Sequence, residues 1–414
     1  MPPAAAPVLT CPAGDALAGG DPLADAVIAE LDLHGDRVRH ALAAGLRYGA
    51  AGPAGPAGPA GLDAPLPAAV AALLEQVETA PAGLDPLTPH RGDITTLSVP
   101  PLWFQLCSVP AALAHLYASP AVAGQLVRAG GQQDLATRRL VETGVWIRQA
   151  LRPGGLLRGA PGYVATVRLR LRHARLRASA TAGGRDTSAG GVPVSQADTA
   201  RLWLGFTLVA YEALAAVGIE ISGEEERHLY AYWSYVAHLL GIDDSLHQGV
   251  ATHADARRLR DLLDSRTAAP DATSRALTAA TVDAQARAMA GAPGTALSEE
   301  QVRTLIHRVL RQALGDGPAE RLGLPAPTPA PTPTSAPAVA PATTDLMPLI
   351  GELNRQARYW QTFSASSAAE ARRRALAEPG SAPEPVTGVL RGVTHCLPRR
   401  PAPPRGTRIS APAA

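Results

Sequence analysis

The sequence predicts an all-α protein with a single large helical core domain, and three observations lead to this prediction. Apolar residues make up 46% of the chain and aromatic residues only 4%, so the apolar content is mainly Ala, Leu and Val, which pack well between helices. From about residue 85 to 315 the apolar residues recur at helical spacing, and clusters of Pro and Gly are short. No alternating Val/Ile-rich segment of convincing strand length competes with this pattern.

The expected helices follow one another along the chain. Residues 22–48 and 67–78 show helical periodicity in the N-terminal part. In the core we expect helices at about 111–128, 134–151, 162–180, 196–217, 223–240, 253–265, 272–290 and 298–314. Ser222 and Ser298 precede acidic residues, a combination that favours a helix N-terminus. The Gly/Ser/Thr-rich stretch from 183 to 192 is expected to be a loop between two helices.

Composition divides the chain into four expected segments. Residues 1–62 are expected to hold an N-terminal helical segment followed by a Gly/Pro/Ala linker, and residues 63–318 the helical core domain. Residues 319–344 are rich in Pro, Ala and Thr and are expected to be a disordered linker. The C-terminal extension, 345–414, is expected to be partly helical and mostly disordered, because it is rich in Pro and Arg.

The charged residues exclude several classes of chemistry. The chain contains no lysine, so all 38 basic residues are arginine, and neither a P-loop lysine nor a Schiff-base lysine is possible. The net charge is only +2 and basic and acidic residues are interspersed, so we expect no nucleic-acid partner. Three cysteines, Cys11, Cys107 and Cys396, lie too far apart for a thiolate zinc motif or a covalent c-type haem attachment.

The sequence also carries an expectation about localisation. The first twenty residues contain no basic region followed by a sustained apolar run, and the chain has no stretch of about 18 apolar residues free of charge. We therefore expect a cytoplasmic protein without a transmembrane segment.

The most unusual segment is a run of arginines around one histidine. On a helix, residues three and four apart share a face, so Arg170, His173 and Arg177 are expected to form one stripe. Two neighbouring cations keep an imidazole neutral, and the neutral form can donate a lone pair to a metal. The alternative is that these arginines form a solvated helix face with a surface histidine.

This segment resembles a signature of the bacterial rubber oxygenases and the broader MpaB-type oxygenases. The stretch Arg170-Leu-Arg-His173-Ala-Arg-Leu-Arg177 resembles the family's R-l-x-H-A-x-x-R motif, and Arg139 followed by Thr143 resembles its distal Arg-x-x-x-Thr. The resemblance implies that His173 is the proximal ligand of haem b, with Arg139 and Thr143 on the other side of the iron. Arg170 and Arg177 are suited to bind the two haem propionates, because guanidinium groups pair bidentately with carboxylates.

Two further stretches, 196–206 with 218–219 and 232–246, resemble the paired helices of the family and its W-x-x-x-x-x-L-L-G-[IV] motif. There are also departures. Glu142 stands where some rubber oxygenases have a lysine that can cap the iron, so a catalytic part for Glu142 cannot be carried over directly, and His247 stands where the family often has proline. His238, His247 and His253 have spacings that do not share a helical face, and we interpret them as ordinary surface or core residues.

The resemblance implies a haem-b-dependent oxygenase that uses dioxygen to cleave a C=C bond in an apolar isoprenoid or lipid-like small molecule. Two alternatives stay open at this point. One is a haem protein that senses or carries without turnover, and the other is a haem-free helical module that recruits partners through its Pro-rich segments. Arg139 and Thr143 are expected to point the same way from their helix, although an exposed pair is equally compatible with their spacing.

Overall fold

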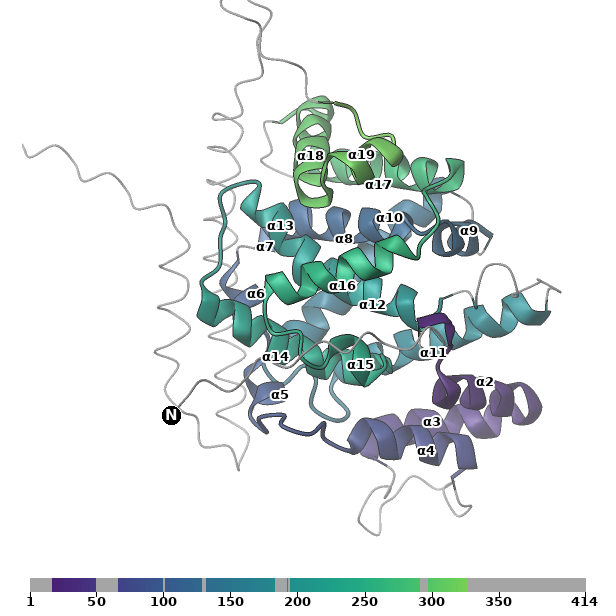
Figure 1. The fold of residues 1–414 in the computed structure, drawn as a ribbon. Helices are drawn as coiled ribbons and strands as arrows, with labels where there is room; N and C mark the ends of the chain where they lie inside the picture. Colours follow the sequence, from purple (N-terminus) through teal and green to yellow (C-terminus); the bar gives the residue numbers. More distant parts are fainter. Residues whose placement is uncertain are drawn as a thin grey trace, which may run out of the picture.

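The fold is entirely helical over the residues that the structure describes. The structure, a computed structural model, describes residues 17–49, 66–99, 101–128, 132–182, 192, 194–290 and 297–326. Within these residues every regular element is a helix (Figure 1), which confirms the predicted fold class. The expected linker beyond 326, the C-terminal extension and the first sixteen residues lie outside the described residues.

The helices run in chain order through three groups. The N-terminal group consists of α2 (Pro22–His34), α3 (Asp36–Tyr48), α4 (Ala68–Glu78), α5 (Thr88–Arg91) and α6 (Ile94–Ser98). The central group consists of α7 (Pro101–Trp103), the π-helix η1 (Phe104–Ser108), α8 (Val109–Tyr117), α9 (Pro120–Arg128), α10 (Gln132–Leu151), α11 (Pro161–Ala182), α12 (Gln196–Leu204), the π-helix η2 (Gly205–Val209) and α13 (Ala210–Ala215). The C-terminal group consists of α14 (Gly223–Leu240), α15 (Asp244–His247), α16 (His253–Ser265), α17 (Ala272–Ala290), α18 (Glu299–Leu314) and α19 (Asp316–Arg321).

Two expected helices are broken where the sequence supplies a helix terminator. The segment 22–48 divides at Gly35, whose φ of +50° ends α2 while its N–H bonds to Leu31. The segment 111–128 divides before Pro120, which begins α9 because proline lacks the N–H that a preceding helix would need. The capping boxes at Ser222 and Ser298 are present as expected.

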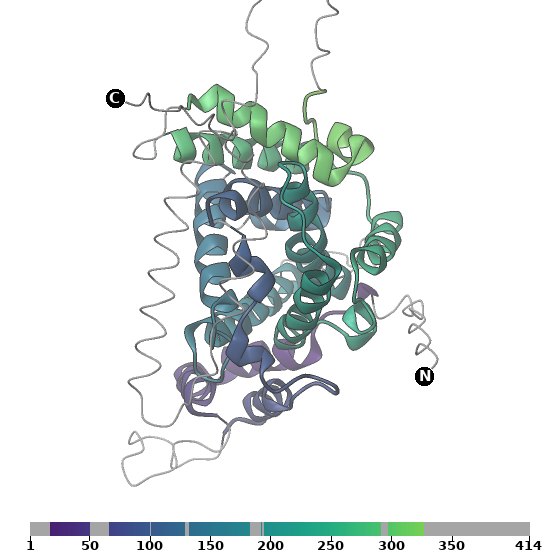
Figure 2. The same cartoon turned by 90° about the vertical axis from the view of Figure 1, so that its left-hand side faces the viewer.

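The arrangement has two ends with a central layer between them. In Figures 1 and 2, α2, α3 and α4 lie at one end and α17, α18 and α19 at the other. Helix α11 packs against α2, α10 and α14, while α8 packs against η2, α12 and α17. The N-terminal helices contribute Leu17, Val27 and Val38 to the same apolar core as the central helices. At the other end, residue 318, the expected end of the core domain, lies inside α19. Leu322 and Leu324, which follow this helix, are buried.

Helices α8 and α12 approach each other closely at a glycine. A Cβ on Gly205 would lie 3.2 Å from the carbonyl oxygen of Ala112, so any larger residue would push η2, the continuation of α12, slightly away from α8. The π-helical turn η2 lies at this contact, and a second π-helical turn, η1, precedes α8. As a result, α8 and α12 form one thin wall in the middle of the molecule.

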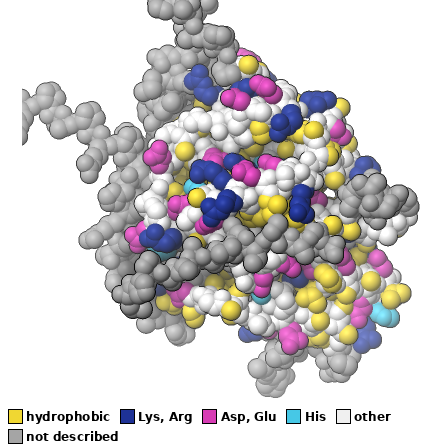
Figure 3. Space-filling view, in the orientation of Figure 1, with side chains coloured by type: hydrophobic (Ala, Val, Ile, Leu, Met, Phe, Trp, Pro, Cys, Tyr) yellow, Lys and Arg dark blue, Asp and Glu magenta, His cyan; other side chains and the backbone are white. Residues whose placement is uncertain are grey.

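The outer surface carries mixed charge. On the face shown in Figure 3, arginines and acidic side chains are interspersed rather than gathered by sign. Within the described residues no single helix is long and apolar enough to cross a membrane. Only a pair, Thr88–Ser98 with Pro101–Tyr117, reaches that length and apolarity together, and it is bent by 82°.

Candidate functional site

His173 lies in the wall of a pocket between five helices. The pocket encloses about 460 Å³, part of it open to solvent, between α8, α9, α10, α11 and α12. Most of its wall is apolar, and its polar members come mainly from α10, α11 and α12. The lining residues are Leu116, Val122, Gln125, Leu126, Arg139, Arg172, His173, Leu176, Val194, Asp198 and Leu202.

The environment of His173 keeps its imidazole neutral. The residue is only 8% exposed, and burial, together with the charges of Arg139, Arg177 and Arg172, lowers the pKa of its ring to about 3. Its Nδ1 atom is buried and has no hydrogen-bond partner among the described residues. A neutral imidazole whose ring is not engaged by a protein group keeps a lone pair for a metal ion.

Arg139 reaches the same pocket from α10. Its side chain is 13% exposed, and its Nε atom is buried without a hydrogen-bond partner in the described part of the chain. Thr143, one turn further along α10, is 8% exposed and therefore buried, but it is not among the residues that line the pocket. The structure thus brings Arg139 and His173 together in one pocket, while Thr143 is buried on α10 one turn from Arg139 and outside the lining.

Glu142 lies on the outer side of α10, where it bridges two arginines. Its carboxylate is 2.9 Å from Arg172 Nη1 on α11 and 3.6 Å from Arg139 Nη1. The side chain is 39% exposed. Both arginines line the pocket, so Glu142 ties α10 to α11 beside the pocket and offsets part of its positive charge. A catalytic role for Glu142 stays a prediction.

Arg170 is buried where α11 packs against the start of α2, and it is not among the residues that line the pocket. Its Nε and Nη2 donate to the two carboxylate oxygens of Asp21 at 2.5 and 3.0 Å, and its Nη1 donates to Gln76. Asp21 is also the N-cap of α2, accepting from the N–H of Ala24. This bidentate pair therefore fixes the start of α2 on α11.

Arg177 makes a second attachment to α2. Its Nε donates to Asp25 at 2.8 Å and its Nη1 to the carbonyl of Val194 at 2.9 Å, while its Nη2 is buried and unpartnered among the described residues. Neither Arg170 nor Arg177 lines the pocket. The binding of cofactor carboxylates by these two arginines stays a prediction. The structure shows both of them paired with acidic residues at the start of α2.

One glycine makes room for the Arg170 pair. Gly241 ends α14 with φ +70°, and a Cβ there would lie 2.3 Å from Arg170 Nε and 2.5 Å from Asp21 Oδ2. Gln196 Nε2 donates to the carbonyls of Gly20 and Gly241 at 3.1 and 2.9 Å. Gln196 and Gly241 belong to the two stretches singled out in the sequence, so these stretches meet at the attachment of α2.

Asp198 is a pocket residue that the sequence did not single out as functional. It forms a capping box with Ser195 at the start of α12 and accepts a hydrogen bond from Ser119 at 3.1 Å. Burial raises the pKa of its carboxyl group, and hydrogen bonds from Ser195 and Ser119 oppose that rise. The S-x-x-D spacing could have predicted the cap but not the pocket.

The three histidines that the sequence placed off any common helical face have separate partners. His238 hydrogen-bonds to Gln76, His247 to Ser234, and His253 to Tyr230. Within the described residues, no group of three or more His, Cys, Asp and Glu side chains is arranged to hold a metal ion.

Comparison with known proteins defines the class. Residues 102–349 match the model of a family described as "ER-bound oxygenase mpaB/B'/Rubber oxygenase, catalytic domain". Since this match covers more than half of the 414 residues, the chain belongs to this oxygenase family, as its sequence motifs predicted. No curated protein matches the chain.

A solved structure shares the fold. It is described as latex clearing protein in the closed state, and it aligns with a TM-score of 0.57 over 94% of both chains at 19% sequence identity. At this identity the comparison shows a common helical architecture.

Proposed function

We propose that this protein is a haem-b-dependent oxygenase that cleaves a C=C bond of an apolar, isoprenoid-like substrate with dioxygen. The observation that carries the proposal is His173, a buried and neutral imidazole with an unpartnered ring nitrogen in an apolar pocket that also holds Arg139. Membership of the oxygenase family supports the same reading.

The residues around the pocket fit a haem group in their chemistry. His173 would hold the haem iron, because its ring offers a lone pair that no protein donor competes for. The two propionates would need cations, and Arg172 lines the pocket, while Arg177 has one buried unpartnered nitrogen. Leucine and valine side chains suit the apolar macrocycle.

When bound, the haem would supply the binding and activation of dioxygen. The protein would contribute three things. His173 would hold the cofactor; Leu116, Leu126 and Leu202 would exclude water from the reacting atoms; and the Arg139 guanidinium would stabilise negative charge on the reacting oxygen. In the net reaction one alkene and one dioxygen give two carbonyl groups, so atoms and electrons balance without an external reductant.

The walls favour a substrate with no charge. The apolar members of the pocket come from four different helices, so an alkene would be surrounded by methyl and methylene groups on several sides. We propose a small isoprenoid or lipid-like alkene, because the space beside His173 is lined by residues from five helices that converge on it.

The test is the absorption spectrum of the full chain expressed with added haem precursor, followed by a pyridine haemochrome assay. We expect a Soret band of b type that His173→Ala abolishes or shifts. The matched control is His247→Gln, because His247 is also buried but pairs with Ser234 and Asp244 away from the pocket. This control should leave the band unchanged.

A wild-type protein that folds fully without any Soret band would contradict the proposal and favour the haem-free helical module. A Soret band without dioxygen consumption in the presence of isoprenoid alkenes would instead favour the sensor or carrier. Product carbonyls identified by mass spectrometry with ¹⁸O₂ would establish cleavage.

A further inference from the structure

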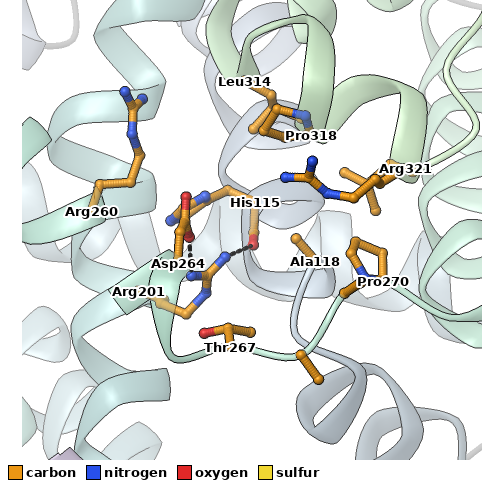
Figure 4. A pocket seen from close by; sticks show the side chains of 13 residues that line it. His115, Ala118, Arg201, Arg260, Asp264, Thr267, Pro270, Leu314, Pro318 and Arg321 are labelled. Carbon is orange, nitrogen blue, oxygen red and sulfur yellow. Dashed lines mark hydrogen bonds and ion pairs between the residues drawn. The ribbon is translucent and has the colours of Figure 1, made fainter. Parts of the chain in front are cut away.

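A second pocket lies on the other side of the wall formed by α8 and α12. It encloses about 520 Å³, part of it open to solvent, between α8, α12, α16, α18 and α19. Figure 4 shows His115 and Arg201 at its centre, with the guanidinium of Arg321 pointing toward them and Leu314 and Pro318 above. Whereas the His173 pocket has mainly apolar walls, this pocket contains three arginines, Arg201, Arg260 and Arg321.

Two buried nitrogens in this pocket lack partners. His115 is 3% exposed and Arg201 2% exposed, yet His115 Nε2 and Arg201 Nε have no hydrogen-bond partner among the described residues. A buried polar atom left unpaired costs free energy, so each one calls for an explanation, and two on neighbouring residues of one pocket call for a common one. Arg201 Nε is always an N–H donor and needs an acceptor, and the same acceptor would satisfy His115 Nε2 in the tautomer that carries the proton on that nitrogen.

The charges of the pocket are unbalanced toward positive. Arg260 is paired with Glu212 at 2.7 Å, and in Figure 4 its side chain points away from the centre. Arg201 Nη1 pairs with Asp264, and its Nη2 donates to the carbonyl of His115 at 3.3 Å. Arg321 has no ion pair within the described residues. One arginine charge therefore faces the pocket without a counter-charge.

Asp264 indicates which chemistry this pocket accepts. Its carboxylate already occupies one nitrogen of Arg201, but its side chain is 39% exposed and can turn toward solvent. A free oxyanion that replaced it would gain Arg201 Nε, His115 Nε2 and Arg321 as donors. Apart from Thr267, the rest of the lining is apolar and would contact a short hydrocarbon body; it consists of Ala118, Ala268, Ala269, Pro270, Leu314, Pro318 and Leu322.

We propose that this pocket binds a small organic anion, with a carboxylate or phosphate head on Arg201, Arg321 and His115 and an apolar body against Leu314, Pro270 and Pro318. The site is separate from the His173 pocket and does not depend on the function proposed for it. The two pockets share a wall, because α8 supplies His115 to one and Leu116 to the other, and α12 supplies Arg201 and Leu202 likewise.

The test is isothermal titration calorimetry on the full-length protein at constant ionic strength, with inorganic phosphate, acetate and hexanoate as probes. We expect binding, and Arg321→Gln should weaken it about tenfold, as the loss of one charge-assisted contact does. The matched control is Arg308→Gln, because Arg308 is an exposed arginine on α18 outside the pocket. This control should change the affinity by less than about twofold.

The probes distinguish the sources of the anion. Hexanoate binding more tightly than acetate assigns an organic carboxylate with an apolar body, and phosphate binding alone assigns a phosphorylated compound. Absence of binding for every probe would overturn the proposal, and so would an equal loss in Arg321→Gln and Arg308→Gln. Haem content is measured separately in the same preparations, so this result stands apart from the test on His173.

Asp264→Asn provides a second, opposite test. Because it removes the competing carboxylate, it should raise the affinity for the same anions, and added phosphate should raise the melting temperature of the variant more than that of the wild type. If Asp264→Asn binds more weakly than the wild type, Asp264 is not the displaced group and the proposed mode of binding is wrong.

Discussion

Helix α11 has two sides that differ in how fully their polar side chains are paired, one toward α2 and one toward the His173 pocket. On the face toward α2, Arg170 and Arg177 are buried and bonded to Asp21 and Asp25. On the face toward the pocket, His173 is buried with an unpartnered ring nitrogen. On the side toward α2, most of the N–H donors have hydrogen-bond partners. On the side toward the pocket, donors and a lone pair have no partner among the described residues. The difference separates residues that hold the helix from residues that are available for chemistry.

The largest expected effect is a loss of stability when the contact between α11 and α2 is disrupted. Asp21→Asn keeps a good N-cap for α2 but leaves the buried charge of Arg170 without its counter-charge. We expect the free energy of unfolding to fall by about 3–5 kcal/mol, measured by chemical denaturation. The matched control is Asp32→Asn, which removes an exposed pair with Arg175 and should cost less than about 1 kcal/mol. Equal losses of unfolding free energy in the two variants would mean that the buried Asp21–Arg170 pair contributes no more than the exposed Asp32–Arg175 pair.

The second prediction concerns the pocket face. Arg139→Leu removes the guanidinium whose Nε is buried and unpartnered in the pocket. We expect the haem absorption to persist while dioxygen-dependent turnover falls by about 100-fold, as when one preorganised donor is lost from an active site. Arg138→Leu, an exposed arginine next in the chain, is the control and should keep full turnover. A parallel loss of absorption and turnover in Arg139→Leu would instead assign Arg139 to holding the cofactor.

The third prediction uses a buried histidine that is remote from α11. Burial lowers the pKa of His115 well below its ordinary value of 6.5, and the charges of Arg201 and Arg260 lower it further. Below about pH 6.5 the unfolded chain therefore binds a proton at this position that the folded chain does not, so stability falls as the pH falls. His115→Gln should make the free energy of unfolding less dependent on pH between 6.5 and 5. An unchanged slope would show that His115 is charged in the folded state.

The smallest effect is expected at Glu142. Its contacts with Arg172 and Arg139 are partly exposed, so Glu142→Gln should lower the free energy of unfolding by less than about 1 kcal/mol. The Soret maximum should not move, because the carboxylate faces the two arginines. A shifted maximum would place Glu142 at the iron and give it the part that lysine has in some relatives.

The sequence predicted most of the fold because helical periodicity and capping are local properties. Helices α14, α16 and α17 have the expected bounds, and Ser222 and Ser298 cap helices as their spacing indicates. The break before Pro120 and the π-helical turn at Gly205 were not predicted, since apolar periodicity continues across both positions. The break before Pro120 follows from the missing N–H of proline, whereas the π-helical turn at Gly205 lies where η2 packs against α8.

The site was predictable only in part, for a physical reason. Spacing of three and four residues correctly indicated that Arg170, His173 and Arg177 share a buried stripe. The spacing could not show that the arginines of this stripe contact α2 while His173 lines a pocket. The partner of Arg170 lies 149 residues away in the chain. The buried pairing of His115 with Arg201 was likewise invisible, since no short motif joins α8 to α12.

The attachment of α2 has a practical consequence for anyone who shortens this protein. The family match begins at residue 102, and a fragment cut there would omit Asp21, Asp25 and Gln76, which together engage two guanidinium groups on α11. Such a fragment would keep every residue of the His173 pocket and still expose two charged side chains where a helix used to lie. Its poor solubility or empty haem content would then report on the missing first hundred residues rather than on the catalytic residues themselves.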